Sequence, residues 1–171
     1  MDDEDEAMSE RPLAIVDIDG VLADVRHRLH YIEGRPRDWD GFFAAAVDDP
    51  SHPEGIALVA TLQADHEIVF LTGRPRRLAS DTERWLSDQG VGGHRVIMRP
   101  ERDRRPAAAV KVELLRQLAR GRRVAVVVDD DTDVIAAMRR AGYPTFHADW
   151  EQRTDADEHE LNVAQDKLGR T

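Results

Sequence analysis

The sequence contains no cysteine, which excludes disulfides, thiolate catalysis and cysteine-ligated metal sites. It also has no apolar run approaching the roughly 20 residues of a membrane-spanning helix, so we expect no membrane span. The first ten residues are acidic and lack the basic start and apolar stretch of a signal peptide, so we expect a cytoplasmic protein. Lysine is rare, and Lys111 is the only one in the central region. Because arginine and lysine are not interchangeable at a tight site, Lys111 weakly indicates a requirement for a compact ammonium group.

The charge of the chain is unevenly distributed. The net charge is −10 over 171 residues, but residues 1–10 carry six acids and no Lys or Arg. Residues 151–171 carry six acids against three bases, which leaves a net of −1 for residues 11–150. We therefore expect an acidic tail at 1–10, one folded domain at 11–150 and an acidic segment at 151–171. The overall charge does not exclude an anionic substrate at a local site on the domain.

Predicted strands and helices alternate along the domain. We expect strands at 13–17, 67–71, 95–98, 123–128 and 144–147, and helices at 54–64, 75–89, 107–119 and 132–141. This order predicts a three-layer α/β/α, Rossmann-like fold with a mainly parallel sheet. Residues 24–53 form a small cap-like insertion, with one short helix at 39–47 capped by Asp38. In such folds ligands bind beyond the carboxyl ends of the strands.

The first strand ends in two closely spaced carboxylates, in the sequence Asp17-Ile18-Asp19-Gly20-Val21-Leu22. Carboxylates two residues apart could hold a hard cation such as Mg²⁺ through oxygen ligands. One of them could instead attack an electrophile while the other moves protons. The alternative is an ordinary turn, because Asp-Gly is a common turn dipeptide.

The second strand ends in Leu71-Thr72-Gly73-Arg74. A hydroxyl, an exposed backbone N–H and a guanidinium together can bind an oxyanion such as a phosphate group. Thr-Gly is also a common exit from a strand into a loop. Lys111, early in the predicted helix at 107–119, could add positive charge to the same site, or it could be a solvated helix lysine.

The fourth strand ends in a run of acids, Asp129-Asp130-Asp131, with Asp133 at the start of the next helix. One or two acids can cap a helix. Several adjacent carboxylates repel one another unless a cation neutralises them, so the excess favours a metal site.

These motifs, in this order, resemble the haloacid dehalogenase superfamily of phosphohydrolases, and the resemblance covers about residues 11–150. It implies that Asp17 is the nucleophile and Asp19 the acid and base. It implies Mg²⁺ as cofactor, held by Asp17, the backbone carbonyl of Asp19, and either Asp129 or Asp130. It further implies phosphate binding by Thr72, the N–H of Gly73, and Lys111, with Arg74 as a candidate second anion contact.

A nearer likeness is to the phosphatase half of phage-type polynucleotide kinase–phosphatases. The chain is similar to them in Leu22-Ala23-Asp24, His27-Arg28-Leu29-His30, Asp38-Trp39-Asp40-Gly41-Phe42-Phe43 and the helix Val134 to Arg139. The tryptophan that often precedes the arginine of that helix is absent, and no GxxxxGK[ST] kinase motif occurs. The likeness implies a phosphorylated nucleic-acid end as substrate, with a 3′-phosphate as the leading expectation.

Two alternatives to that function stay open, a nucleotidase or other small-molecule phosphatase and a catalytically silent phosphate-binding domain. An arginine-rich loop could follow a nucleic-acid backbone or be simply solvated. Its arginines are Arg99, Arg102, Arg104 and Arg105. We further expect His27, His30 and Trp39 either to line the entrance to the site or to serve packing.

Overall fold

A computed structural model describes residues 11–151 and contains one five-stranded sheet in the order β3-β2-β1-β4-β5. The strands are β1 (Leu13–Val16), β2 (Glu67–Pro75), β3 (Arg95–Arg99), β4 (Val124–Asp129) and β5 (Thr145–His147). All neighbouring strands are parallel. The predicted α/β fold class is therefore confirmed. None of the described helices is long and apolar enough to cross a membrane.

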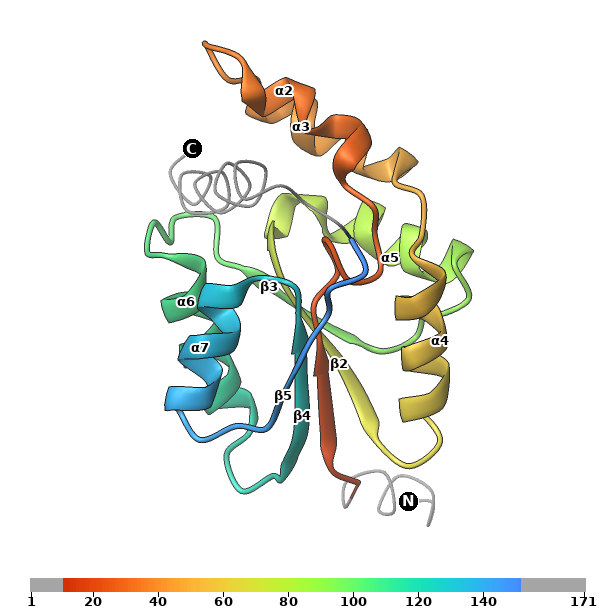
Figure 1. Cartoon of the computed structure of the whole chain (residues 1–171), viewed down its shortest axis with the longest axis vertical. Coiled ribbons are helices and arrows are strands. Elements are labelled where there is room, and N and C mark those ends of the chain that lie inside the picture. Colours follow the sequence, from red (N-terminus) through yellow and green to blue (C-terminus); the bar gives the residue numbers. More distant parts are fainter. Residues whose placement is uncertain (1–10, 152–171) are drawn as a thin grey trace.

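Helices cover both faces of the sheet, as Figure 1 shows. One face carries α4 (Pro53–Leu62) and α5 (Ala79–Asp88), and the other carries α6 (Ala107–Leu118) and α7 (Thr132–Arg140). Strand β1 lies in the middle and alternates between the two cores. Ala14 and Val16 pack on the α4/α5 side, whereas Leu13 and Ile15 pack on the α6/α7 side. Burial on both faces explains why this strand is apolar throughout.

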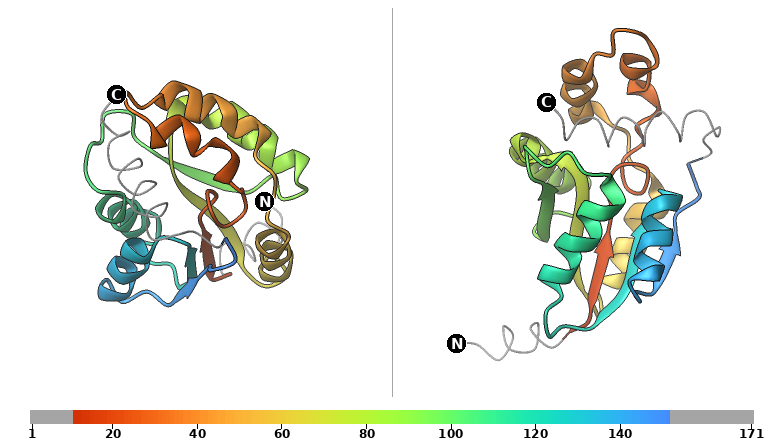
Figure 2. Two further views of the ribbon diagram at one scale, coloured as in Figure 1. Left: turned by 45° about the horizontal axis from the view of Figure 1, so that its top comes forward. Right: turned by 90° about the vertical axis from the view of Figure 1, so that its left-hand side faces the viewer.

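The insertion lies over the carboxyl edge of the sheet, as Figures 1 and 2 show. It contains η1 (Arg26–Arg28), α2 (His30–Glu33), α3 (Trp39–Ala44) and η2 (Ala45–Asp48). Its own apolar cluster consists of Val25, Leu29, Ile32, Phe42 and Phe43. The insertion thus has a small core of its own above the site.

The predicted helix at 39–47 is correct at its start, where Asp38 accepts a 2.8 Å hydrogen bond from the N–H of Gly41. The α-helix ends earlier than expected, at Ala44, and continues as the 3₁₀ turn η2. The elements η1 and α2 were not predicted. They are too short to show periodicity or to be stable alone, and they depend on the packing of the insertion.

The end of β2 also differs from the prediction. The strand runs on to Pro75, with a register shift against β3 between Thr72 and Pro75. The helix expected at 75–89 therefore begins later, as the 3₁₀ turn η3 (Arg76–Leu78) followed by α5. Because of this extension, Thr72, Gly73 and Arg74 belong to the strand and have fixed positions.

The last described residues form a strap across the loop that follows β1. The N–H of Ala148 donates to the carbonyl of Asp129 at 2.9 Å, and the indole N–H of Trp150 donates to the carbonyl of Val21 at 3.0 Å. Glu151 is buried and its carboxylate lies 3.3 Å from Nε2 of His52. Glu151 therefore packs against the domain. The remaining predicted tail residues, at 1–10 and 152–171, lie outside the described part of the chain.

Asp24 supplies a prediction about acid stability. Hydrogen bonds from Arg26, at 2.6 to 3.0 Å, lower the pKa of Asp24 from 3.8 to about 2. Since the folded state lowers this pKa, the carboxylate contributes stability above pH 3.8 and loses it as the pH falls toward 2. We expect Asp24→Asn to lower the free energy of unfolding by about 1 kcal/mol at pH 7.

Urea unfolding at pH 7 and near pH 2 measures this effect, with Asp88→Asn at an exposed position of α5 as the control. The deficit of Asp24→Asn relative to wild type should disappear at the lower pH. An equal deficit at both pH values would show that the charge of Asp24 is not its source.

Candidate active site

Three carboxylates converge where β1 and β4 end side by side. Asp17 follows β1 directly, and its N–H donates to the carbonyl of Val128 at 2.9 Å. Asp129 is the last residue of β4, and Asp130 follows it. One carboxylate oxygen from each of the three lies within 4.8 Å of the others, and all three residues are largely buried. The pairing of these two strands thus turns motifs more than 100 residues apart into one cluster.

Lys111 lies beside this cluster rather than in solvent. Its Nζ is 2.7 Å from Oδ2 of Asp129 and 3.1 Å from Oδ1 of Asp17, and the residue is 2% exposed. Burial acts to lower the pKa of Lys111, but the carboxylates of Asp129 and Asp17 outweigh it and raise the pKa above its ordinary value. Lys111 therefore stays charged, and its burial rules out the solvated-lysine alternative for this residue.

The cluster holds more negative charge than Lys111 compensates. Burial, followed by the nearby charge of Asp129, raises the pKa of Asp17 well above its ordinary value. Burial also raises the pKa of Asp131 to about 6. Asp131 caps α7 by accepting from the N–H groups of Asp133 and Val134, so its position in the acidic run is explained by the helix.

A divalent cation fits this arrangement. The donor set is made of carboxylate oxygens, which are the ligands that Mg²⁺ prefers, and the excess negative charge is what a cation would offset. Asp17, Asp129 and Asp130 are the residues that could hold it. Both oxygens of Asp129 also have protein partners, namely Lys111 and the N–H of Asp131.

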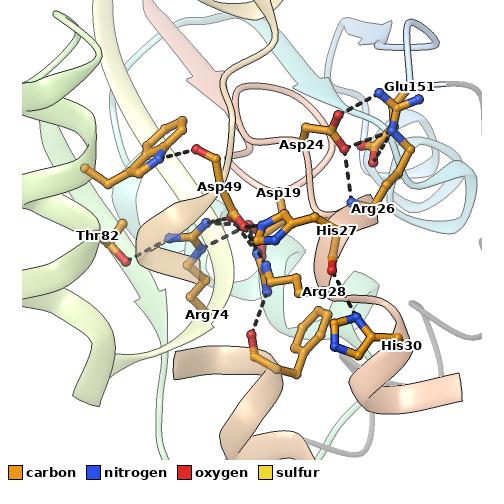
Figure 3. Close-up of polar contacts among 12 residues, drawn as sticks. Asp19, Asp24, Arg26, His27, Arg28, His30, Asp49, Arg74, Thr82 and Glu151 are labelled. Atoms are coloured by element: carbon orange, nitrogen blue, oxygen red, sulfur yellow. Dashed lines mark hydrogen bonds and ion pairs between the residues drawn. The ribbon is translucent and has the colours of Figure 1, made fainter. Parts of the chain in front are cut away.

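Asp19 contacts two buried arginines, as Figure 3 shows. Its Oδ1 accepts from Arg74 at 2.6 and 3.0 Å and from Arg28 at 3.0 Å. Burial acts to lower the pKa of Arg74, but Asp19 outweighs it and raises the pKa. Asp19 is therefore held in a fixed orientation by two permanent positive charges.

Asp49 joins the same network from the other side. Its carboxylate accepts from Arg28 at 2.7 and 2.8 Å and from Arg74 at 3.0 Å, and it lies 2.7 Å from Nε2 of His27. Burial raises the pKa of Asp49, while the charge of Arg28 acts against this rise. Two acids thus alternate with two arginines in a buried network that joins the insertion to the sheet (Figure 3).

Arg28 and Asp49 have no role predicted from the sequence. Arg28 lies in a stretch that carried the family likeness, but Asp49 lies in a loop with no recognisable pattern. Arg74 was predicted as a phosphate contact, and the structure places its guanidinium on Asp19, Asp49 and the hydroxyl of Thr82. Thr72 is buried, and its hydroxyl oxygen accepts from the N–H of Arg74 at 3.1 Å. The phosphate-binding roles of Thr72, Gly73 and Arg74 stay predictions.

The arginine-rich loop is only partly available to a ligand. Arg99 is 2% exposed and donates to the carbonyls of Asp103 and Arg105, so it is not a solvated side chain, and its contact with a nucleic-acid backbone stays a prediction. Arg105 is paired with the carboxylates of Asp103 and Glu113. The other two predicted arginines are exposed: Arg102 and Arg104.

Comparisons with known proteins identify the family. Residues 12–152 match the phosphatase domain of polynucleotide kinase PNKP. The chain belongs to this family. A comparison with curated proteins finds no match. The PNKP-type phosphatase domain is a haloacid dehalogenase phosphatase, so the predicted enzyme class is confirmed.

Solved structures share the fold of this chain. A chain of the Pnkp1/Rnl/Hen1 RNA repair complex aligns with a TM-score of 0.65 and 23% identity, over 80% of this chain and 42% of that chain. The present chain thus spans less than half of that relative. A haloacid dehalogenase-like hydrolase from Streptococcus pneumoniae aligns with a TM-score of 0.61 and 14% identity, over 89% and 91% of the two chains. The HAD-hydrolase YfnB from Bacillus subtilis, bound to magnesium, aligns with a TM-score of 0.58 and 11% identity, over 84% and 91%.

Proposed function

We propose that this PNKP-type domain is a Mg²⁺-dependent phosphomonoester hydrolase that removes a 3′-phosphate from nucleic-acid ends through an aspartyl-phosphate. The observation that carries the proposal is the position of Asp17. Its carboxylate lies at the end of β1, 3.1 Å from the ammonium of Lys111 and clustered with Asp129 and Asp130. A carboxylate in this setting can approach an anionic phosphate because positive charge from Lys111 and a bound cation offsets their repulsion.

In the first step, the carboxylate oxygen of Asp17 attacks phosphorus in line and the bond to the leaving oxygen breaks. Asp19 gives its proton to that oxygen, which departs as a hydroxyl group. In the second step, Asp19 takes a proton from water, and the oxygen of that water attacks phosphorus. The phosphate leaves and the Asp17 carboxylate is regenerated, so that Asp19 ends the cycle with the proton it began with.

The remaining groups bind the substrate and hold the cation. Mg²⁺ would be held by Asp17, the backbone carbonyl of Asp19, and Asp129 or Asp130, and it would supply charge stabilisation to the transferred phosphoryl group. Thr72, the N–H of Gly73, and Lys111 would bind the equatorial phosphate oxygens, where charge accumulates. Thr72 and Gly73 belong to β2, the neighbour of β1, and Lys111 belongs to α6 and contacts Asp17 and Asp129.

Arg28, Arg74 and Asp49 position the proton carrier. The two guanidinium groups hold the carboxyl of Asp19 in one orientation. Asp49 balances part of their charge.

The nature of the substrate is inferred from three features. The chain belongs to the family of the polynucleotide kinase PNKP phosphatase domain, and one structural neighbour is part of an RNA repair complex. The insertion is small, so it leaves room for the end of a polymer. Arg102 and Arg104 are exposed cations that could contact a phosphate backbone.

Phosphate release in the presence of Mg²⁺ tests this function. The substrates are a 3′-phosphorylated oligonucleotide, a 3′-mononucleotide, a 5′-mononucleotide and a small sugar phosphate. We expect the oligonucleotide to have the highest kcat/KM. Release from mononucleotides alone would favour the nucleotidase alternative, and release from none of the four would favour a silent phosphate-binding domain.

A further inference from the structure

A hollow of about 260 Å³ opens on the insertion, away from the carboxylate cluster. Four residues of one short stretch line it: Arg35, Pro36, Arg37 and Trp39. The lining thus combines an indole ring with two guanidinium groups and contains no acid. Such a combination suits a ligand that has both a planar ring and a negative charge.

Arg37 has an unused donor at this hollow. Its guanidinium carbon lies 5.9 Å from the centre of the Trp39 ring. Its Nη1 is buried and has no hydrogen-bond partner among the described residues. A buried donor without an acceptor costs free energy. Arg37 as a whole is half-buried and lines the hollow, so a turn of its guanidinium would let a phosphate oxygen there accept from it.

Aromatic contacts link this hollow to the reacting groups. The ring of Trp39 packs edge-on against Phe42, with centroids 6.1 Å apart. The guanidinium of Arg28 lies 4.3 Å from the centre of the Phe42 ring and donates to Asp19 at 3.0 Å. One strand of B-form DNA advances about 3.4 Å per nucleotide. The Trp39 ring therefore lies within the length of a few nucleotides of Asp19.

We propose that this hollow is a nucleotide subsite, in which Trp39 stacks on a nucleobase upstream of the terminal phosphate and Arg37 binds the adjoining phosphodiester. The inference rests on the proposed function, because it assumes a single-stranded nucleic-acid substrate. Of the nearby acids, Asp38 is engaged in capping α3, while Glu33 and Asp40 are exposed. Since these acids offset the two arginines, stacking rather than net charge supplies most of the affinity.

Substrate length tests the subsite. We expect Trp39→Ala to raise KM for a 3′-phosphorylated pentanucleotide about 10-fold, with kcat and all constants for a 3′-mononucleotide unchanged. Trp39→Phe, which keeps an aromatic face, should largely restore the wild-type KM. Phe146→Ala is the matched control, because Phe146 is an exposed aromatic residue outside the insertion. A change in kcat for both substrates would instead indicate that Trp39 acts only by packing on Phe42, and would overturn the subsite.

A binding measurement separates the subsite from the catalytic proposal. Fluorescence anisotropy of a labelled pentanucleotide with a 3′-hydroxyl measures binding and requires no hydrolysis. Trp39→Ala and Arg37→Gln should each raise the Kd for this pentanucleotide about 10-fold. Weakened binding in a protein without phosphatase activity would keep the subsite and reject the proposed function. Unchanged binding and unchanged KM in an active enzyme would reject the subsite alone.

Discussion

Asp17→Asn should reduce phosphate release from a 3′-phosphorylated oligonucleotide at least about 10,000-fold. The amide cannot form the aspartyl-phosphate, and the other residues of the site act on a nucleophile that is no longer present. The measurement is kcat at saturating Mg²⁺, with purified protein and a sensitive phosphate assay. Asp133→Asn is the matched control, because Asp133 belongs to the same acidic run and is exposed on α7. Loss of less than 10-fold in Asp17→Asn would remove Asp17 from the role of nucleophile.

The same substitution should stabilise the protein when Mg²⁺ is absent. Burial and the neighbouring carboxylates raise the pKa of Asp17, so its ionised form is unfavourable in the folded state. A neutral side chain of the same shape removes this repulsion. We expect a higher Tm for Asp17→Asn than for wild type in chelator, and a smaller difference in Mg²⁺. This combination separates a catalytic loss from misfolding.

Lys111→Met should have the largest effect on stability. The ammonium is buried between Asp17 and Asp129, and its removal leaves two carboxylates close together with no positive charge between them. Breaking a buried ion pair in this way costs about 3–5 kcal/mol. Loss of the cation that faces the phosphate should also lower kcat by about 100-fold or more.

Urea unfolding and activity are measured for Lys111→Met beside Arg116→Met, which removes an exposed cation from the same helix. Mg²⁺ should recover part of the stability of Lys111→Met, because the cation replaces some of the missing charge, but it should not restore activity. Equal stability of the two variants would contradict a buried Lys111.

The sequence predicted the centre of the site because each of its motifs lies at the end of a strand. Parallel pairing brings such ends to one edge, and β1 is the neighbour of both β2 and β4. Asp17, Asp129 and Asp130 therefore meet as expected, with Lys111 beside them. The order of strands and helices could also be predicted from the sequence, since apolar runs alternate with amphipathic segments throughout 53–147.

The network around Asp19 could not be predicted from the sequence in the same way. Arg28 and Asp49 lie in the insertion, where no element is long enough to show a period. Their contact depends on how the insertion folds back over the sheet, and local sequence carries no signal for that. For Arg99 the sequence suggested exposure, because the residue lies in an arginine-rich stretch. Its side chain is instead buried and donates to two carbonyl groups of that loop.

The central claim is that the site removes a terminal 3′-phosphate from nucleic acid. A competition in one reaction tests it most directly, with equal amounts of two oligonucleotides of the same sequence, one phosphorylated at the 3′ end and one at the 5′ end. We predict that the 3′-phosphate is released with a kcat/KM at least about 10-fold higher, and that Asp17→Asn releases neither. Equal release from both ends, or faster release of the 5′-phosphate, would contradict the account.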